Sequence, residues 1–277
     1  MTHSNFDSHW LSLREPVDHR SRATNLSLLL ADYWKDHEDI KILDLGCGTG
    51  SNMRYLSPYL ENKNQQWTLL DHDSSLLQQI SRPQHNGLKL EPLLGDLNKE
   101  GLALVAKNDL VTGSALLDLT SEEWLTKLAE RCISQSCVAY FTLSYNGEVS
   151  WHSTQDGDTN PAYVRDHDRI CNIFNRHQTR DKGTGPALGP SAVGKLNDLF
   201  EDNGYATKCS PSPWLLDHRD RSLNKLLIEG WAESALEECP NESKRILSWS
   251  RTSLEMGNSL EYQLQVSHLD FLAFPQY

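Results

Sequence analysis

Apolar residues in the first 145 positions form short runs that alternate with stretches of helical spacing. The short runs predict strands over residues 40–45, 66–73, 88–96, 108–116 and 137–145. The helical spacing predicts helices over residues 23–34, 51–60, 74–80 and 121–132, the last beginning near Ser121. Strands that alternate with helices are typical of a parallel sheet with helices on both faces, so we predict an α/β fold.

This alternation stops after Tyr145. Residues 146–190 are mainly polar, and we expect an irregular segment with one short helix near residues 169–177. A long irregular segment in a compact domain is usually a lid or a binding loop. The pattern then resumes and predicts helices over residues 191–205, 220–239 and 242–256, and strands over residues 206–212 and 261–275.

With 277 residues, the chain can bury a sizeable core. We predict a single domain over residues 1–277, with an N-terminal cap at about 1–35 and a lid or substrate insertion at about 146–190. The formal net charge of −12, without a basic patch, disfavours nucleic acid as a partner. The sequence leaves the oligomeric state open.

The cellular compartment is predicted from the lack of a membrane-spanning run or a signal peptide in this sequence and from the spacing of the cysteines. No apolar run approaches the roughly 20 residues that span a bilayer, and the N-terminus does not resemble a signal peptide. The six cysteines are dispersed and form no CxxC pair, which favours reduced thiols over a disulfide framework. These features together predict a cytoplasmic protein with no membrane partner.

The stretch IKILDLGCGTGSNMRYL, residues 40–56, places Gly46, Gly48 and Gly50 directly behind an apolar run. A strand that turns into a helix through glycines brings backbone N–H groups close to an anionic or electron-rich ligand. Dinucleotide-binding enzymes need Gly or Ala where Ser51 stands. The register is instead D-x-G-x-G-x-G, with Asp44 inside the motif.

This motif resembles the first motif of the class I S-adenosylmethionine-dependent methyltransferases, and the resemblance covers about residues 38–145. Asp71 follows the second apolar run, where the family places an acid on the ribose hydroxyls. Residues 95–98, GDLN, lie where the family has an acid near the adenine amino group. Residues 109–119 match the strand that ends beside the sulfonium. The resemblance implies a Rossmann-like seven-stranded, mostly parallel sheet with an antiparallel last strand, and S-adenosyl-L-methionine as cofactor.

The resemblance also implies the cofactor-binding residues. Asp44 would fix the loop and receive the methionine ammonium, directly or through water, whereas NAD has no ammonium to supply. His72 would stack on the adenine or face solvent. The implied set is Asp44, Gly46, Cys47, Gly48, Gly50, Asn52, Asp71, His72, Asp96, Leu97 and Ser114.

Candidates for the acceptor site follow the strands, because open α/β sheets bind ligands at the carboxyl ends of their strands. His177 is a candidate general base, with Arg180 and Lys182 holding an acidic group, although a solvated loop would have the same composition. Asp118 and Tyr145 are further catalytic candidates that would equally suit capping or packing. Arg20 is a candidate substrate clamp, with a solvated charged face as the alternative.

We expect no metal. Residues 156–160, DGDTN, imitate the start of a calcium loop but lack its turn glycine and its glutamate, and the histidines show no zinc-binding spacing. The predicted function is methyl transfer to a small molecule. The alternatives are protein methylation, since an acidic surface attracts basic tails, and a non-catalytic S-adenosylmethionine-binding protein.

Overall fold

The computed structural model describes residues 7–60, 64–81, 87–154 and 161–276. Its strands are β1 (Asp39–Leu45), β2 (Asn64–Asp71), β3 (Leu88–Leu94), β4 (Leu110–Ser114), β5 (Val138–Ser153), β6 (Tyr205–Pro211), β7 (Trp214–Leu216) and β8 (Tyr262–Pro275). Its helices are α1 (Ser8–Ser21), α2 (Thr24–Tyr33), α3 (Ser51–Leu56), α4 (Ser74–Leu77), α5 (Leu102–Leu104), α6 (Glu122–Ser134), α7 (Pro161–Gln178), α8 (Ala192–Glu201), α9 (Arg221–Glu238) and α10 (Ser243–Asn258).

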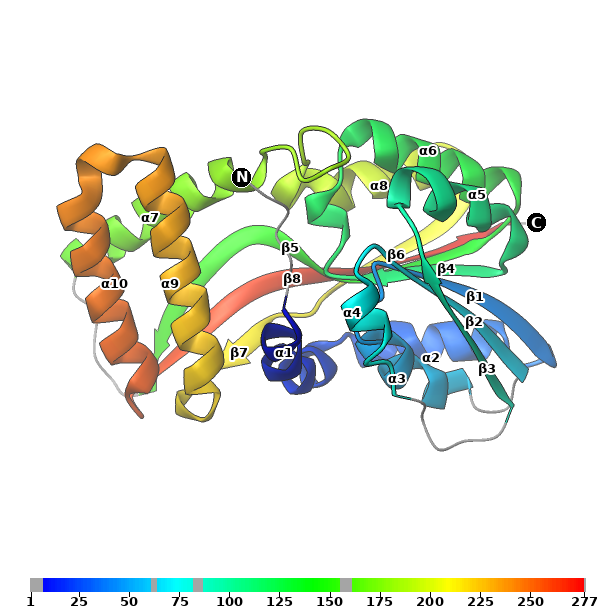
Figure 1. Cartoon of the computed structure of the whole chain (residues 1–277), viewed down its shortest axis with the longest axis horizontal. Helices are drawn as coiled ribbons and strands as arrows, with labels where there is room; N and C mark the ends of the chain where they lie inside the picture. The colour runs from blue at the N-terminus through cyan, green and yellow to red at the C-terminus, as the bar shows by residue number, and fades with distance from the viewer. Residues whose placement is uncertain (1–6, 61–63, 82–86, 155–160, 277) are drawn as a thin grey trace.

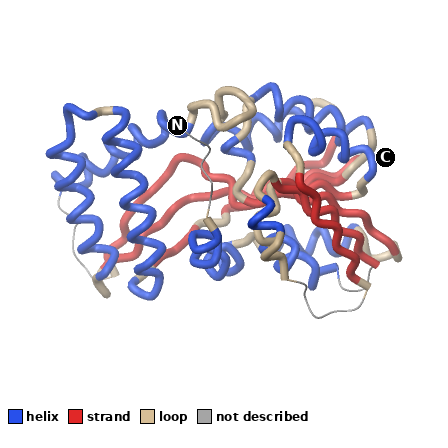
Figure 2. Tube along the Cα trace, in the orientation of Figure 1, coloured by secondary structure: helices blue, strands red, loops and turns tan. Residues whose placement is uncertain are grey.

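One mixed sheet organises these elements (Figure 1). The strand order is β3-β2-β1-β4-β5-β8-β6; the first five strands are parallel, and β8 runs antiparallel to both β5 and β6. Helices cover both faces, with α2 and α3 on one side and α5, α6 and α8 on the other (Figure 2). The predicted Rossmann-like sheet is confirmed, and the short β7, which pairs with β8, adds an eighth strand.

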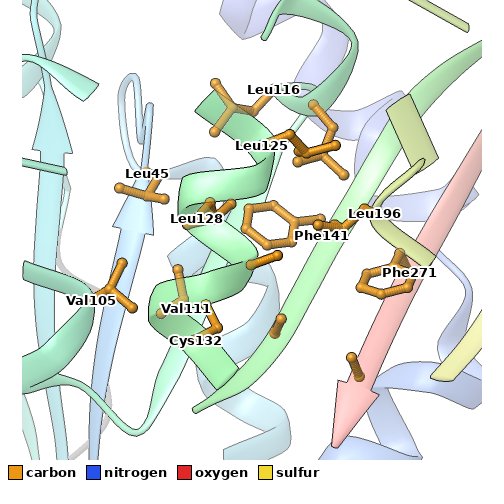
Figure 3. Close-up of a cluster of buried hydrophobic side chains, with 14 of the residues drawn as sticks. Leu45, Val105, Val111, Leu116, Leu125, Leu128, Cys132, Phe141, Leu196 and Phe271 are labelled. Atoms are coloured by element: carbon orange, nitrogen blue, oxygen red, sulfur yellow. The ribbon is translucent and has the colours of Figure 1, made fainter. Parts of the chain in front are cut away.

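A hydrophobic core beneath α6 holds the parallel half of the sheet together (Figure 3). Apolar side chains of α6 recur at helical spacing, with Trp124, Leu128 and Cys132 all buried. They pack against Val111 of β4 and Phe141 of β5. This packing fixes the carboxyl ends of the strands, where the sequence places its candidate site.

The strands β5 and β8, with 16 and 14 residues, extend well beyond the rest of the sheet. The helices α7, α9 and α10 pack at this extended end, around a separate hydrophobic cluster that includes Trp231, Trp249 and Leu264 (Figure 1). The chain therefore has two parts, a parallel sheet with the glycine loop and a helical extension built on two long strands.

The segment over residues 146–190 differs from the expected irregular loop. Its first part continues β5, because Val149 and Trp151 pair with Val266 and Leu264 of β8. Its middle forms the whole of α7 rather than one short helix. The sequence pattern concealed α7 because His167, a polar residue, takes a core position of this helix. Val149 O lies 3.0 Å from His167 Nε2, and Trp249 Nε1 donates a hydrogen bond to His167 Nδ1 over 3.3 Å. Whether this segment acts as a lid stays a prediction.

The helices α1 and α5 and the strand β7 were not predicted from the sequence. The helix α1 begins behind Asp7, whose side chain accepts a hydrogen bond from Trp10 N over 2.7 Å. Only Val17 and Asp18 of this helix are buried, so it shows little apolar periodicity. The strand β7 is three residues long, too short to show alternation.

No helix among the described residues is long and apolar enough to cross a membrane. Within the same ranges, no group of three or more His, Cys, Asp or Glu side chains is arranged to hold a metal ion. The calcium-like stretch at residues 156–160 lies outside the described residues.

The predicted cap of α6 is confirmed and yields a stability test. The Ser121 hydroxyl accepts a hydrogen bond from Trp124 N over 3.2 Å and donates one to Thr184 O over 2.5 Å. We expect Ser121→Ala to lower the free energy of unfolding by about 1–2 kcal/mol, because it removes the helix cap and a loop anchor. Urea denaturation measures the change. The control Ser134→Ala, at the exposed end of the same helix, should have little effect; equal losses in both variants would contradict the capping role.

Candidate active site

The glycine loop connects β1 to α3. Gly46, Gly48 and Gly50 all have positive φ angles, of 64°, 54° and 83°, in a region that side-chain-bearing residues rarely adopt. Between them, Cys47 donates its backbone N–H to Leu70 O over 3.0 Å, and burial raises the pKa of its thiol. The Cys47 thiol therefore stays protonated; it lines the loop and does not act as a nucleophile.

Asp44 is fully buried at the end of β1. Asn52 Nδ2 donates to Asp44 Oδ1 over 2.7 Å and lies 3.1 Å from Thr112 Oγ1. Among the described residues, Asp44 Oδ2 has no hydrogen-bond partner. Burial raises the pKa of Asp44 to about 7, opposed by the hydrogen bond from Asn52. An orphaned carboxylate oxygen in this position fits a ligand ammonium, so the residues present suit the predicted cofactor.

Arg22 completes this network. Its side chain is 1% exposed, and its Nη2 donates to Asn52 Oδ1 over 3.0 Å. Its guanidinium also lies over the ring of Tyr55, 4.4 Å from the centroid. Arg22 thereby orients the amide of Asn52, which in turn holds Asp44.

Asp71 lies at the end of β2 and faces the glycine loop. Its Oδ2 accepts a hydrogen bond from Gly48 N over 2.7 Å, and its Oδ1 accepts one from Asp73 N over 2.9 Å. The neighbouring His72 is 63% exposed on its side chain, with Nδ1 3.4 Å from Asp71 Oδ1. Each carboxylate oxygen keeps a further lone pair, so Asp71 can still accept bonds from a diol.

The remaining predicted cofactor residues line the same edge of the sheet. Asp96 is exposed and caps the turn at Leu97–Gly101 by accepting a hydrogen bond from Asn98 N over 2.7 Å. Leu97 O accepts a hydrogen bond from Trp124 Nε1 over 3.1 Å, which fixes this turn against α6. Ser114 ends β4 and is partly buried.

The helix α1 lies across the glycine loop. Leu11 Cδ1 is 3.2 Å from the point that a Cβ on Gly48 would occupy. Glu15 accepts two hydrogen bonds from Arg54, of 2.7 and 2.6 Å, and His19 Nε2 lies 3.1 Å from Ser51 Oγ. The N-terminal segment is therefore fastened to α3 by polar contacts of Glu15 and His19, which both follow Leu11.

Beside this loop, a cavity of about 420 Å³ lies between α1, α7, α9 and the carboxyl edge of the sheet. We call it the acceptor cavity. Its walls include five aromatic rings, those of Trp10, Tyr145, Phe174, Trp214 and Trp231. Its polar and charged lining comprises Arg14, Asp118, His177, Gln178, Lys182, Glu233, Ser234, Glu237 and His268.

Burial in the walls of the acceptor cavity shifts the pKa values of several groups that line it. Burial raises the pKa of Asp118 to about 6, opposed by the charges of Arg14 and Lys182, among other contacts. Burial lowers the pKa of Lys182, and the charge of Arg180 adds to the effect. Burial also lowers the pKa of His268 to about 3, so this imidazole is neutral at physiological pH.

Of the residues predicted to serve the acceptor, the structure brings four together. His177, Tyr145, Asp118 and Lys182 all line the cavity. The Tyr145 hydroxyl donates to Asn175 Oδ1 over 2.8 Å, and burial raises its pKa, so it is suited to positioning rather than to proton abstraction.

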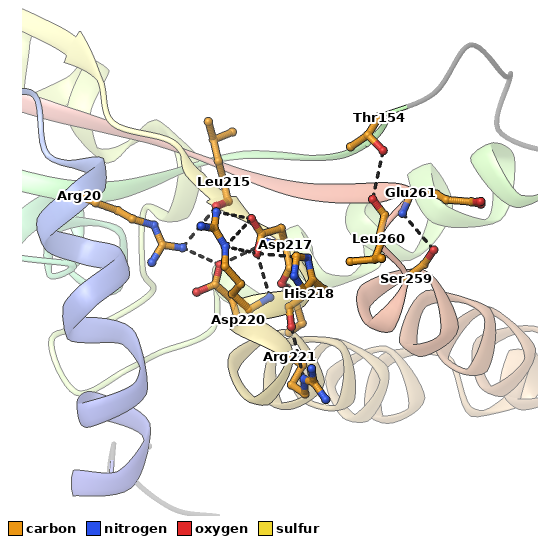
Figure 4. Close-up of polar contacts among 12 residues, drawn as sticks. Arg20, Thr154, Leu215, Asp217, His218, Asp220, Arg221, Ser259, Leu260 and Glu261 are labelled. Carbon is orange, nitrogen blue, oxygen red and sulfur yellow. Dashed lines mark hydrogen bonds and ion pairs between the residues drawn. The ribbon is translucent and has the colours of Figure 1, made fainter.

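Two predicted substrate residues lie elsewhere. Arg180 is not part of the cavity lining; it forms ion pairs of 3.2 and 2.6 Å with Glu237 and Glu238 of α9. Arg20 donates to Asp220 Oδ2 over 2.6 Å and to Leu215 O over 3.4 Å, which joins α1 to the turn before α9 (Figure 4). Both arginines thus hold elements together, and Trp10 and His268 line the cavity without having been predicted as site residues.

Comparison with known proteins identifies the glycine loop. Residues 42–134 match the family model described as "Methyltransferase domain". Over these residues, the chain carries a methyltransferase domain. The match spans β1 to α6 and includes Asp44, the three glycines and Asp71. No curated protein matches this methyltransferase in sequence.

Solved structures share the fold of the methyltransferase at low identity. A cyclopropane-fatty-acyl-phospholipid synthase-like protein from Lactobacillus casei is 14% identical, with a TM-score of 0.51 over 94% of this chain and 99% of that chain. A methyltransferase from Geobacter sulfurreducens in complex with S-adenosyl-L-homocysteine is 13% identical, with a TM-score of 0.41 over 98% of this chain and 99% of that chain. The first likeness supports the fold alone.

We expect the ionisation of Asp44 to control cofactor affinity. The affinity for S-adenosylhomocysteine should fall up to tenfold per pH unit below about pH 7, because protonated Asp44 no longer pairs with the ligand ammonium. Calorimetry at several pH values measures this. Asp44→Asn should bind weakly at every pH, whereas the control His72→Asn should keep the pH dependence. An unchanged profile in Asp44→Asn would assign the titration to another group.

Proposed function

We propose that this methyltransferase transfers the methyl group of S-adenosylmethionine to a small molecule bound in the acceptor cavity. The observation that carries the proposal is the position of the cavity directly beside the glycine loop. Ala115, which follows β4, lines the cavity, and the adjacent Leu116 lies 3.4 Å from the point that a Cβ on Gly46 would occupy. A methyl group held by the loop would therefore face an acceptor in the cavity, and proximity supplies much of the rate of such a displacement.

The cofactor-binding roles in this proposal follow the contacts of each residue. Asp44 Oδ2 receives the methionine ammonium, and the positive-φ glycines leave the backbone exposed to the ligand. Asp71, already ordered by Gly48 N, accepts hydrogen bonds from the ribose hydroxyls. Asp96 and Leu97 lie at the next strand end, where the adenine would rest.

The form of the cavity supports a small acceptor over a protein chain. Its lining comes from α1, β5, α7, α9 and β8, which surround it from several directions. Apolar walls with a few convergent polar groups are typical of small-molecule sites. In this proposal Asp118, His177 and Lys182 contact the acceptor, Tyr145 positions it, and Arg180 and Arg20 stabilise the surrounding helices.

The six cysteines, all within the described ranges, are free thiols, which supports the predicted cytoplasmic location.

Gly230 offers further support. It lies inside α9, on the face that also presents Leu227, Ser234 and Glu237 to the cavity. Apart from its chain neighbours and its own helix backbone, no described atom lies within 4 Å of the point that a Cβ on Gly230 would occupy. Glycine inside a helix costs roughly 0.5–1 kcal/mol relative to alanine, and nothing in the packing here requires it. The space that Gly230 preserves belongs to the cavity.

The proposal is tested first by screening small-molecule extracts for release of S-adenosylhomocysteine. Gly230→Phe should then reduce this release at least tenfold, because the ring would fill the cavity, while cofactor affinity stays unchanged. The control Gly194→Phe, in α8 and equally free of neighbours, should retain activity. Full activity of Gly230→Phe would place the acceptor elsewhere.

The ribose role of Asp71 has a separate test. Asp71→Ala should weaken S-adenosylhomocysteine binding by at least tenfold, because hydrogen bonds to a carboxylate contribute about 1.5–3 kcal/mol each. Calorimetry measures the affinity, and circular dichroism checks the fold. The control Asp73→Ala changes the exposed cap of α4, so it should leave the affinity nearly intact. Unaltered binding by a folded Asp71→Ala variant would exclude the ribose contact.

A further inference from the structure

Three buried hydrogen-bond acceptors on residues that line the acceptor cavity have no partners. Asp118 Oδ1, His177 Nδ1 and His268 Nδ1 have no hydrogen-bond partner within the part of the chain that the structure describes, and all three residues line the cavity. Buried polar atoms are nearly always paired, and leaving one unpaired costs about 1–3 kcal/mol. The cavity is therefore built for a ligand that donates hydrogen bonds.

The neighbours of the two histidines indicate that their free nitrogens accept hydrogen bonds. His177 Nε2 lies 3.4 Å from Glu237 Oε2, so the proton of the neutral ring belongs on Nε2. The ring of His268 interacts with the backbone carbonyl of Val266, which leaves Nδ1 as the unprotonated nitrogen. Trp10 Nε1 is the complementary case, an unpartnered buried donor on the same cavity wall.

Two cations act on Asp118. Arg14 is held by Asp18 through contacts of 2.8 and 3.3 Å and lies over the ring of Trp214. Lys182 has no ion-pair partner in the described ranges, and its charge acts on Asp118. A negative charge that develops on a ligand beside Asp118 would therefore be stabilised by Lys182 and Arg14.

These features discriminate between chemical classes of acceptor. A carboxylate would meet three unpaired acceptors and the charge of Asp118, so its binding would be opposed. An alkylamine has a pKa of about 10.4, so it would enter as an ammonium, which Asp118, Glu233 and Glu237 would attract but which has no free lone pair for the methyl carbon. A phenolic hydroxyl is neutral on entry and donates a hydrogen bond, and its ring suits the aromatic walls.

We propose that the methyl acceptor is an aromatic hydroxyl compound with a second hydrogen-bond donor, and that Asp118 takes the proton of the reacting hydroxyl. This rests on the proposed function and names its substrate class. The hydroxyl proton moves to Asp118 Oδ1 while an oxygen lone pair bonds to the methyl carbon of S-adenosylmethionine. The carbon–sulfur bond breaks with its electron pair left on sulfur, giving an aryl methyl ether and S-adenosylhomocysteine. The second donor binds His268 Nδ1.

The product class tests the proposal directly. The enzyme is incubated with trideuteromethyl-labelled S-adenosylmethionine and small-molecule extracts, and labelled products are identified by mass spectrometry. An aryl methyl ether, which survives mild base, is the expected product. A labelled methyl ester, methylamine or thioether would overturn the substrate class but leave the proposed function standing. A lack of any labelled small molecule would contradict the proposed function itself.

Variants test the role of Asp118. With the identified acceptor, Asp118→Asn should lower kcat by at least a hundredfold and leave S-adenosylhomocysteine affinity unchanged. His268→Leu should raise the acceptor KM about tenfold, and His268→Asn, which restores an acceptor atom, should recover most of this loss. A kcat for Asp118→Asn within a few fold of the wild type would overturn the proton transfer.

The pH dependence of kcat shows whether Asp118 or His177 is the general base. The titratable and charged groups around the cavity are Arg14, Asp118, Tyr145, His177, Lys182, Glu233, Glu237 and His268. The wild-type kcat should rise with pH through about 6 and then level, because the base works only when deprotonated. His177→Asn should keep this rise, whereas the residual activity of Asp118→Asn should lack it. The reverse result would make His177 the base.

Discussion

The buried guanidinium of Arg22 joins the N-terminal segment to both the glycine loop and the last strand. It donates to Asn52, which holds Asp44, and lies 3.9 Å from Asp270. Asp270 in turn accepts hydrogen bonds from the backbone N–H groups of Ala23 and Leu143, over 2.9 and 2.7 Å. Because a buried charge is tolerated only when it is paired, these contacts fix each other's positions. The same carboxylate therefore fixes the start of α2 and the irregularity in the pairing of β5 with β8 between Phe141 and Ser144.

This network explains why α1 can serve two sites. The helix precedes Arg22 directly, and its residues Leu11, Trp10 and Arg14 reach the glycine loop and the acceptor cavity from one face. These three positions span little more than one helical turn, which rises about 5.4 Å. In the proposed reaction, methyl donor and acceptor are thus covered by the same rigid element. Displacement of α1 would open both sites together.

The two parts of the molecule divide the work of the proposed reaction. The parallel sheet carries the cofactor motif on strand ends fixed by the α6 core. The extension of β5 and β8 carries α7 and α9, which supply 10 of the 21 residues that line the acceptor cavity. A fold of this kind supports many chemistries, because the specificity resides in the added elements and not in the sheet. The proposed phenolic acceptor depends on both parts, because Asp118 follows β4 whereas His268 lies on the extended β8.

The sequence alone determined the parallel half of the fold and the position of the glycine loop. Local sequence features suffice there. The alternation of apolar runs with helical spacing, the Ser121 cap and the glycine spacing each involve residues that are close together in the sequence. The tertiary structure decided the rest. His167 hid α7 because its ring nitrogens find partners only across the fold, and Arg180 proved to pair with glutamates on α9. The acceptor cavity joins residues as distant as Trp10 and His268, and no local pattern encodes which side chains long-range packing brings together.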